Sequence, residues 1–355
     1  MIMEKASFTL QRLYVGIDVH KKQWSVSIFT EALHHKTFSQ PPTCEALKTY
    51  LDKYFPAAQV HCVYEASKLG FWIARQLRGY GYHCLVVNPA DVPTTSKESL
   101  EKTDKIDSGK LARALRGGLL RSIYVPSVEA EGHRQLFRYR KRLQGDLTRI
   151  KNRIKDRLLF AGTRLPEKFD KNCWTKAFIT YLTELELPSA SATMTLNLLL
   201  GQYADTRALL LQTTRELKKL LRLAAYRDNA QLLLAIPGIG PLTGLQLLCE
   251  IEDINRFANF RQLNSFVGFK PMEHSSGEKE HKGRISLRRH NGLRSSLIEC
   301  AWSSVQHDPA LNQAYQQLCQ RMTSKRAMVK IARKLLSRIW HVLKTGEPYQ
   351  IGMAA

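Results

Sequence analysis

The sequence lacks several features that would assign it to a common class of protein. No stretch approaches the roughly 18 apolar residues of a membrane-spanning helix, and residues 1–11 contain no secretory apolar core. The seven cysteines are scattered, with no Cys-x-x-Cys pair and no Cys/His pair at zinc-ligand spacing. We therefore expect a cytoplasmic, nucleoid-associated protein with reduced thiols and neither a disulfide framework nor a structural zinc site.

Acidic residues are scarce relative to basic ones. The 355 residues include 54 Lys and Arg against 31 Asp and Glu, which gives a formal net charge of +23. This surplus favours a polyanionic partner, and nucleic acid is the leading candidate because no membrane segment is expected. The length predicts two or three domains, and the hydrophobic content of 44% is enough to build their cores.

The first part of the chain alternates β-rich runs with helical patterns. Strands are expected at 13–19, 24–29, 33–40, 59–65 and 82–88, and helices at 44–54 and 69–78. Three strands followed by alternating helix and strand predict an α/β domain over residues 1–122 with a mixed sheet. The order matches the ribonuclease H-like topology, in which the first and fourth strands lie side by side.

Four acids occupy related positions in this predicted domain. Asp18 lies in the first strand, Glu65 ends a later one, and Asp104 and Asp107 share one face of a helix running to about Arg116. Carboxylates gathered closely repel one another, so a site that keeps them ionised needs divalent cations, and Mg²⁺ fits oxygen ligands best. Taken singly, the acids could instead be ordinary helix N-terminal or strand-end residues.

The remainder of the sequence is mainly helical. Leu143, Leu147, Ile150, Ile154 and Leu158 form a near-heptad stripe, which predicts a coiled-coil region over 123–230, and residues 196–223 could fold back on it. A C-terminal domain is expected over 231–355. Its segment 237–243 resembles a helix-hairpin-helix turn, although a plain tight turn between helices would look similar. Residues 273–277 are expected to form a polar loop.

Basic residues crowd both helical regions. Contact with nucleic-acid phosphates is predicted for Arg149, Arg153, Lys282, Arg284, Arg288, Arg289 and Arg294.

An ordered set of short motifs carries a family resemblance over nearly the whole chain. In the first domain these are Tyr14–Lys21, Glu65–Ala66, Val86–Pro89 and Lys102–Asp104 with Asp107. Further on they are Pro237–Gly240, Phe266–Gly268, Ser275–Gly277, Gly283–Ile285, Leu293–Arg294 and Glu299–Trp302. With these motifs the chain resembles the DEDD insertion-sequence transposases, a group that includes the Piv/MooV-type invertases and bridge-RNA-guided recombinases.

The resemblance implies a RuvC-like, that is ribonuclease H-like, domain, a helical coiled-coil middle used in assembly, and a C-terminal domain that supplies a serine. Asp18, Glu65, Asp104 and Asp107 would bind Mg²⁺, and Ser276 would be the nucleophile that forms a covalent phosphoserine–DNA intermediate. Adjacent Ser275 is the alternative. The implied partners are double-stranded DNA and a guide RNA. Two departures stand out: Ser108 occupies a position where the family usually has alanine, and Glu278 and Glu280 place negative charge beside the serine.

Three functions stay open from the residues. The first is a transposase that cuts and rejoins DNA through the serine. The second is a metal-dependent nuclease or Holliday-junction resolvase that uses water. The third is a nucleic-acid scaffold without catalysis.

Strand exchange between two duplexes needs several active sites, so a homodimer or homotetramer is expected, with residues 143–158 a candidate seam. A site composed by two protomers would follow if serine and acids are far apart in one chain.

Overall fold

The computed structural model describes residues 11–95, 103–169, 174–276, 279–285 and 290–352. The chain divides into two compact units, Met1–Pro126 and Ser127–Ala355. The first boundary lies four residues beyond the predicted one at 122. The second predicted boundary, at 230, falls inside a helix of the second unit.

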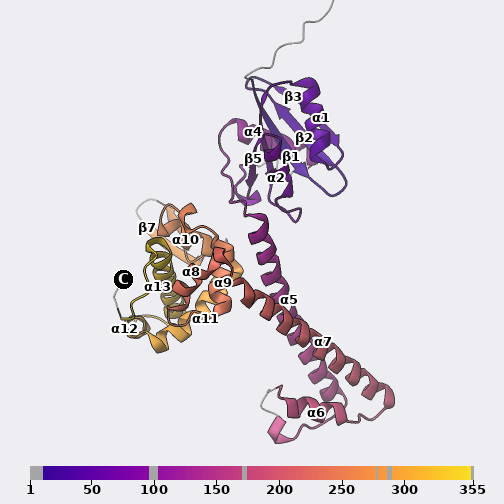
Figure 1. Cartoon of the computed structure of the whole chain (residues 1–355), viewed down its shortest axis with the longest axis vertical. Coiled ribbons are helices and arrows are strands. Elements are labelled where there is room, and N and C mark those ends of the chain that lie inside the picture. The colour runs from indigo at the N-terminus through magenta and orange to yellow at the C-terminus, as the bar shows by residue number, and fades with distance from the viewer. Residues whose placement is uncertain (1–10, 96–102, 170–173, 277–278, 286–289, 353–355) are drawn as a thin grey trace, which may run out of the picture. The chain divides into compact units, whose positions relative to one another are not determined.

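The first unit is built on one five-stranded sheet (Figure 1). Its strands are β1 (Arg12–Val19), β2 (Trp24–Phe29), β3 (His34–Gln40), β4 (Gln59–Glu65) and β5 (His83–Val87). Their order is β3-β2-β1-β4-β5. Strands β1, β2 and β3 are antiparallel to one another in turn, whereas β1–β4 and β4–β5 are parallel. The first and fourth strands are therefore neighbours, as predicted, and the mixed sheet fits a ribonuclease H-like fold.

Helices cover both faces of this sheet. They are α1 (Cys44–Tyr54), α2 (Trp72–Gly79) and α4 (Asp104–Arg116), with a short 3-10 turn, η1, at Pro89–Asp91. Alternate residues of a strand point to opposite faces. Leu13, Val15 and Ile17 of β1 thus share a buried core with Leu47 of α1 and Leu77 of α2. The intervening residues of β1 lie on the face that α4 covers.

The face beneath α4 has unusually small residues. A Cβ atom at Gly16 of β1 would lie 2.1 Å from the carbonyl oxygen of Ser108 and 2.5 Å from the backbone nitrogen of Ala112. The neighbouring strand β2 contributes the buried hydroxyls of Ser25 and Ser27 to the same face. Because these residues are small, the backbone of α4 packs directly on β1.

The second unit is mainly helical. Its elements are α5 (Val128–Phe160), η2 (Glu167–Phe169), α6 (Lys176–Glu184), α7 (Ala190–Leu220), α8 (Ala224–Leu234), α9 (Pro241–Ile251), η3 (Ile254–Arg256), α10 (Phe260–Val267), β6 (Pro271–Ser276), β7 (Lys279–Ile285), α11 (Asn291–His307), α12 (Pro309–Cys319) and α13 (Ser324–Thr345). The helices α8 to α13 surround a second apolar core. No described helix is long and apolar enough to cross a membrane.

The long helices α5 and α7 pack along one another, and α7 returns beside α5 as the sequence predicted (Figure 1). Ile150, Ile154 and Leu158 of the heptad-like stripe lie in one core with Leu196 and Leu200 of α7. The prediction that this stripe forms a seam between protomers needs correction here, because the chain's own helices already cover its apolar side chains.

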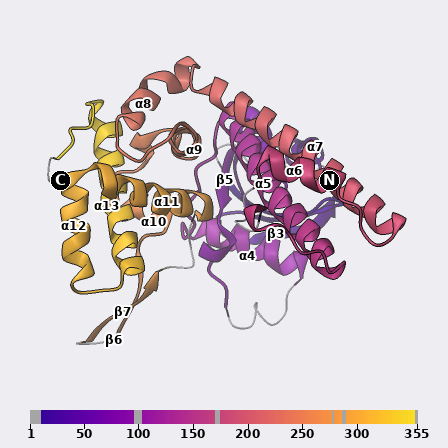
Figure 2. The same ribbon diagram turned by 90° about the horizontal axis from the view of Figure 1, so that it is seen from below.

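A two-stranded ribbon, β6–β7, replaces the predicted polar loop at 273–277. Its strands are antiparallel, with His274 opposite His281 and Ser276 opposite Lys279. In Figure 2 the ribbon projects from the helical part of this unit. The loop prediction failed because the strands are short and polar, without the alternation of apolar residues that indicates a strand.

A buried ion network joins α5 to the end of α9 within the second unit. The guanidinium of Arg134 lies 3.4 Å from the Glu250 carboxylate and 3.5 Å from that of Glu252. It also donates hydrogen bonds to the carbonyls of Cys249 and Glu250. The His290 imidazole Nε2 lies 3.1 Å from the same carboxylate. The start of α5 is thus tied to α9 and, through His290, to the start of α11.

Replacing Gly16 should displace α4. Gly16→Ala forces a methyl group into backbone atoms, so we expect a loss of about 3 kcal/mol of unfolding free energy, in the range of overpacked cores. Gly79→Ala is the matched control, because a Cβ there meets nothing within 4 Å. The measurement is thermal unfolding of the full chain. Equal melting temperatures for the two variants would contradict the close contact between β1 and α4.

Removing Arg134 should leave the buried Glu250 carboxylate and the partly buried Glu252 carboxylate without their guanidinium partner. Arg134→Met is expected to cost about 3–5 kcal/mol, as for other broken buried ion pairs. Arg149→Met, which removes an exposed arginine of the same helix, should change stability by less than about 0.5 kcal/mol. Urea denaturation followed by circular dichroism gives both values. A small loss for Arg134→Met would show that the network is not a structural tie.

Candidate active site

Two of the predicted acids come from adjacent parallel strands. Ile17 of β1 pairs with Tyr64 of β4, and Asp18 and Glu65 are the next residues of the two strands. Both strands run in the same direction, so both carboxylates lie at the same edge of the sheet. Asp18 follows Gly16 by two residues and Glu65 follows buried Val63 by two, so both acids are on the face that α4 covers.

Helix α4 supplies the other two acids. Asp104 is its first residue and Asp107 lies in its first turn, preceded by Thr103, whose hydroxyl caps the helix by accepting from the Ile106 N–H. The side chain of Asp104 is 54% exposed and that of Asp107 is 18% exposed. The helix therefore presents one acid to solvent and one toward the sheet.

A cluster of buried hydroxyls holds this first turn in place. The Ser108 hydroxyl lies 3.1 Å from that of Ser25 and 2.9 Å from that of Ser27, and Ser27 in turn lies 2.7 Å from the Thr37 hydroxyl. Ser108 also donates to the carbonyl of Lys105, one turn back. Hydroxyls that hydrogen-bond across elements in this way fix the relative position of helix and strands. Ser108 thus anchors the turn that carries Asp104 and Asp107.

One side of the site contains Asp18, His20 and Asp104, and it is called the solvent side because His20 and Asp104 are more than half exposed. The His20 Nε2 atom lies 3.1 Å from the Asp18 carboxylate and 3.7 Å from that of Asp104. One donor atom from each of the three residues can be chosen so that all lie within 4.8 Å of one another. This is the spacing that a single metal ion would need.

The inner side contains Glu65, Asp107 and Lys110. The ammonium of Lys110 lies 3.0 Å from the Asp107 carboxylate and 3.9 Å from that of Glu65. Its side chain is only 11% exposed. Lys110 therefore lies between Glu65 of β4 and Asp107 of α4. Asp104 and Asp107 are in turn close enough to Asp18 to raise its pKa, so the four predicted acids belong to one cluster.

The environment of Asp18 disfavours its charge. Burial raises the pKa of the Asp18 carboxyl above its usual value, the charge and hydrogen bond of His20 oppose this, and the nearby Asp104 and Asp107 raise the pKa further. Desolvation and neighbouring negative charge both favour the protonated acid. A cation bound to these carboxylates would remove that penalty.

The donor set fits a divalent cation. Carboxylate oxygens are the preferred ligands of Mg²⁺, and an imidazole nitrogen is also accepted by ions such as Mn²⁺. Asp104 and His20 are more than half exposed, so water and phosphate oxygens can reach the same position.

His20 and Lys110 were not predicted as members of this site. Lys110 lies three residues after Asp107, and on a helix that spacing places the two on one face. His20 follows Asp18 by two residues in the turn after β1. Both signals were present in the sequence, but the predicted metal site rested on carboxylates alone.

The predicted nucleophile lies in the second unit. Ser276 is the last residue of β6, and Ser275 precedes it opposite Glu280. Glu278, the departure noted beside the serine, lies outside the described residues.

The predicted phosphate contacts are scattered over several elements. Arg149 and Arg153 are exposed on α5, where Arg149 pairs with Asp146. Lys282 and Arg284 belong to β7. Arg294 on α11 donates a hydrogen bond of 2.9 Å to the Gly268 carbonyl, so part of its guanidinium supports the fold. Arg288 and Arg289 lie outside the described residues.

The segment that resembles a helix-hairpin-helix turn connects α8 to α9. Gly238 has a positive φ of 92°, and a Cβ there would lie 2.4 Å from the Ser304 hydroxyl of α11. This glycine is therefore required by packing within the unit. Gly240, which precedes α9, is exposed, and a Cβ there would meet nothing within 4 Å.

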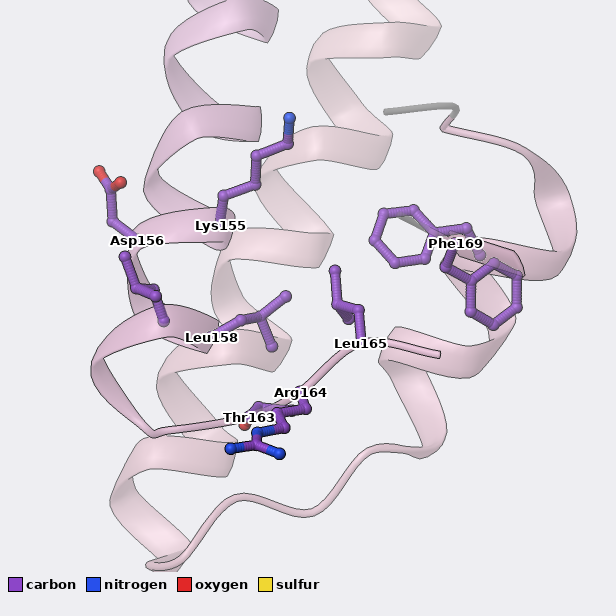
Figure 3. A pocket seen from close by; sticks show the side chains of 9 residues that line it. Lys155, Asp156, Leu158, Thr163, Arg164, Leu165 and Phe169 are labelled. Atoms are coloured by element: carbon purple, nitrogen blue, oxygen red, sulfur yellow. The ribbon is translucent and has the colours of Figure 1, made fainter. Parts of the chain in front are cut away.

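A pocket of about 620 Å³ lies where α5 ends, far along the chain from the acids. In Figure 3, Leu165 lies between Leu158 and Phe169, and Lys155 and Arg164 stand at the rim. Among the described residues that line it, the only acid is Asp156, so they form no acidic cluster of their own.

Family models of transposases match segments of both units. A DEDD transposase model of the IS110 type matches residues 15–161, which include all four acids. A second model, described as the transposase IS116/IS110/IS902 family, matches residues 230–316, which include Ser276.

Relatives that match most of this chain are also transposases. A putative transposase, y4rJ, from Sinorhizobium fredii (strain NBRC 101917 / NGR234) is 32% identical over 83% of this chain and 78% of its own length. The chain belongs to the IS110 family of transposases. The transposase for insertion sequence element IS1533 from Leptospira borgpetersenii is 26% identical over 82% of this chain and 85% of its own length. That for IS1111A from Coxiella burnetii (strain RSA 493 / Nine Mile phase I) is 27% identical, over 78% and 76%.

Membership decides the class of activity. The protein is a DNA transposase, an enzyme whose substrate is DNA, and a DEDD family of this kind typically uses divalent metal. The cluster around Asp18 is the acidic group that fits such a metal. The six cysteines that the structure describes are free thiols.

The raised pKa of Asp18 makes a prediction about stability. Because the pKa of Asp18 is raised in the folded state, ionised Asp18 lowers the free energy of unfolding at pH 7. Asp18→Asn removes that charge, so the variant should melt no lower than wild type at pH 7 without metal. Mg²⁺ at tenfold its Kd should add about 1.4 kcal/mol to wild type and nothing to the variant. Thermal unfolding with and without Mg²⁺ measures both effects.

Asp228→Asn is the matched control, because it removes an exposed carboxylate of the second unit. It should keep the full response to Mg²⁺. If Mg²⁺ stabilises Asp18→Asn as much as wild type, the ion does not bind at Asp18.

Proposed function

We propose that the transposase cuts and rejoins DNA strands with a Mg²⁺ site formed by Asp18, Glu65, Asp104 and Asp107 and with the Ser276 hydroxyl as nucleophile. The observation that carries the proposal is the convergence of four acids from β1, β4 and α4 at one edge of the sheet. Isolated surface acids would not be expected to converge from three separate elements.

The residues of the acid cluster have distinct tasks. Asp104 offers the most exposed carboxylate of the cluster, and Asp18 lies close to it beside the exposed His20, so a DNA phosphate can approach there. Glu65 and Asp107 complete the negative field around that position. Bound Mg²⁺ would stabilise negative charge on the phosphate and ease ionisation of the attacking hydroxyl.

The serine step conserves atoms and charge. The Ser276 oxygen attacks phosphorus, the bond from phosphorus to one deoxyribose oxygen breaks, and that oxygen takes up a proton as the serine hydroxyl loses one. A deoxyribose hydroxyl of another strand then attacks the phosphoserine and releases the serine. A covalent intermediate of this kind retains the energy of the phosphodiester bond for rejoining.

The partners follow from charge and from the family. Exposed basic residues such as Arg149 and Arg153 would contact phosphates, as would Lys282 and Arg284 on the ribbon that carries Ser276. We propose that a guide RNA selects the target by base pairing, so that these side chains recognise backbone shape. Exchange between duplexes then calls for a homodimer or homotetramer.

The decisive experiment is a denaturing gel that detects protein covalently attached to DNA carrying the element ends. Ser276→Ala should reduce the adduct by at least about 100-fold, because the nucleophile is lost, while DNA binding stays within about twofold. Ser275→Ala, the adjacent control, should retain the adduct. Asp18→Asn should abolish strand cutting.

Each result separates the possible functions. An adduct that persists in Ser276→Ala would refute the serine assignment. Strand cutting that survives in Ser276→Ala but not in Asp18→Asn would identify a metal-dependent nuclease that uses water. Unchanged cutting in Asp18→Asn would refute the metal site.

A further inference from the structure

The four acids of the cluster have unequal surroundings. Asp104 is the most exposed of them and lies with Asp18 beside His20, whereas Glu65 and Asp107 lie beside the nearly buried ammonium of Lys110. A site built for two divalent ions would be expected to leave both positions to the metals. Here a side-chain cation already stands on one side.

We infer that the Lys110 ammonium takes the second cation position, so that the cluster binds one divalent ion, at Asp18, His20 and Asp104. This inference rests on the proposed metal site and specifies how many ions it holds. Lys110 is a positioning residue: it balances the charge of Glu65 and Asp107 and keeps them in place beside the bound ion.

Distance and burial support this role for Lys110. Its ammonium is 3.0 Å from Asp107 and 3.9 Å from Glu65. Because only 11% of the Lys110 side chain is exposed, water screens the charge of its ammonium weakly. A divalent ion bound between the same two carboxylates would either contact this positive charge or have to expel it. Both alternatives weaken binding of a second ion.

The backbone of Lys110 is also firmly placed. It follows Ser108, whose hydroxyl bonds to those of Ser25 and Ser27, and it precedes buried Leu111 and Ala112. The contact between Gly16 and α4 prevents the helix from moving toward the sheet, and the hydroxyl bonds hold it there. The start of the Lys110 side chain is therefore fixed relative to Glu65 on β4.

The solvent side offers three ligands for one ion. Two carboxylates and the Nε2 atom of His20 lie within 4.8 Å of one another. A nitrogen ligand with two oxygens suits Mn²⁺, which accepts both. Mn²⁺ is therefore the appropriate probe, because its electron paramagnetic resonance signal reports the number bound and whether a nitrogen is attached.

The experiment titrates Mn²⁺ into the full-length protein and counts bound ions from the loss of the free-ion signal. Wild type should bind one Mn²⁺ per chain. Lys110→Met, which keeps the length of the side chain and removes its charge, should bind two. Lys105→Met is the matched control: it removes an exposed lysine of the same helix and should bind one. Lys110→Arg keeps the charge and should also bind one.

The nitrogen ligand has its own measurement. Electron spin-echo modulation from ¹⁴N should be present in Mn²⁺-loaded wild type and absent in His20→Gln. The Kd for Mn²⁺ should rise about tenfold in that variant, since one ligand is lost. Modulation that persists in His20→Gln would remove His20 from the ligand set and overturn that part of the inference.

The outcomes distinguish this inference from the proposed function. Two Mn²⁺ ions in wild type, with Lys110→Met unchanged, would overturn the single-ion site and leave the metal-dependent function standing. No Mn²⁺ bound to wild type would overturn both. If Lys110→Met fails to fold by circular dichroism, a count of two in Lys110→Arg or in wild type still refutes the inference, and a count of one in both supports it.

Discussion

The whole first unit depends on the close packing of α4 against β1. Gly16 leaves no room for even a methyl group between the strand and the helix backbone. Hydrogen bonds from the Ser108 hydroxyl to those of Ser25 and Ser27 also hold α4 against β2. Since Asp104 and Asp107 lie in the turn that this packing holds, the position of two acids of the site is set by residues that perform no chemistry.

Charge balance is the second constraint on the site. Four carboxylates in a partly buried cluster would oppose folding unless cations met them. The protein supplies two partners from its own chain, His20 on the solvent side and Lys110 on the inner side. Each carboxylate of the cluster therefore has a nitrogen of His20 or Lys110 within 4 Å.

In the second unit, apolar contacts and buried ion pairs hold the helices together. Its heptad-like stripe on α5 is covered by α7 within the same chain, and Gly238 is needed for contact with α11. The buried pairs of Arg134 and His290 with Glu250 connect helices far apart in sequence. The ribbon β6–β7 that carries Ser276 lies between α10 and α11 along the chain, and His290, which precedes α11, belongs to this network.

The sequence by itself determined the strand order around β1 and β4, the helix pair of α5 and α7, and the four acids with the family they indicate, because periodicity and short motifs are local properties. It did not reveal the ribbon, whose polar strands lack alternation, or the structural use of the stripe that had suggested a seam. Only the tertiary structure brought His20 and Lys110 among the acids and made Ser108 an anchor. Such roles depend on distances between elements that are remote in sequence, and no local pattern encodes those distances.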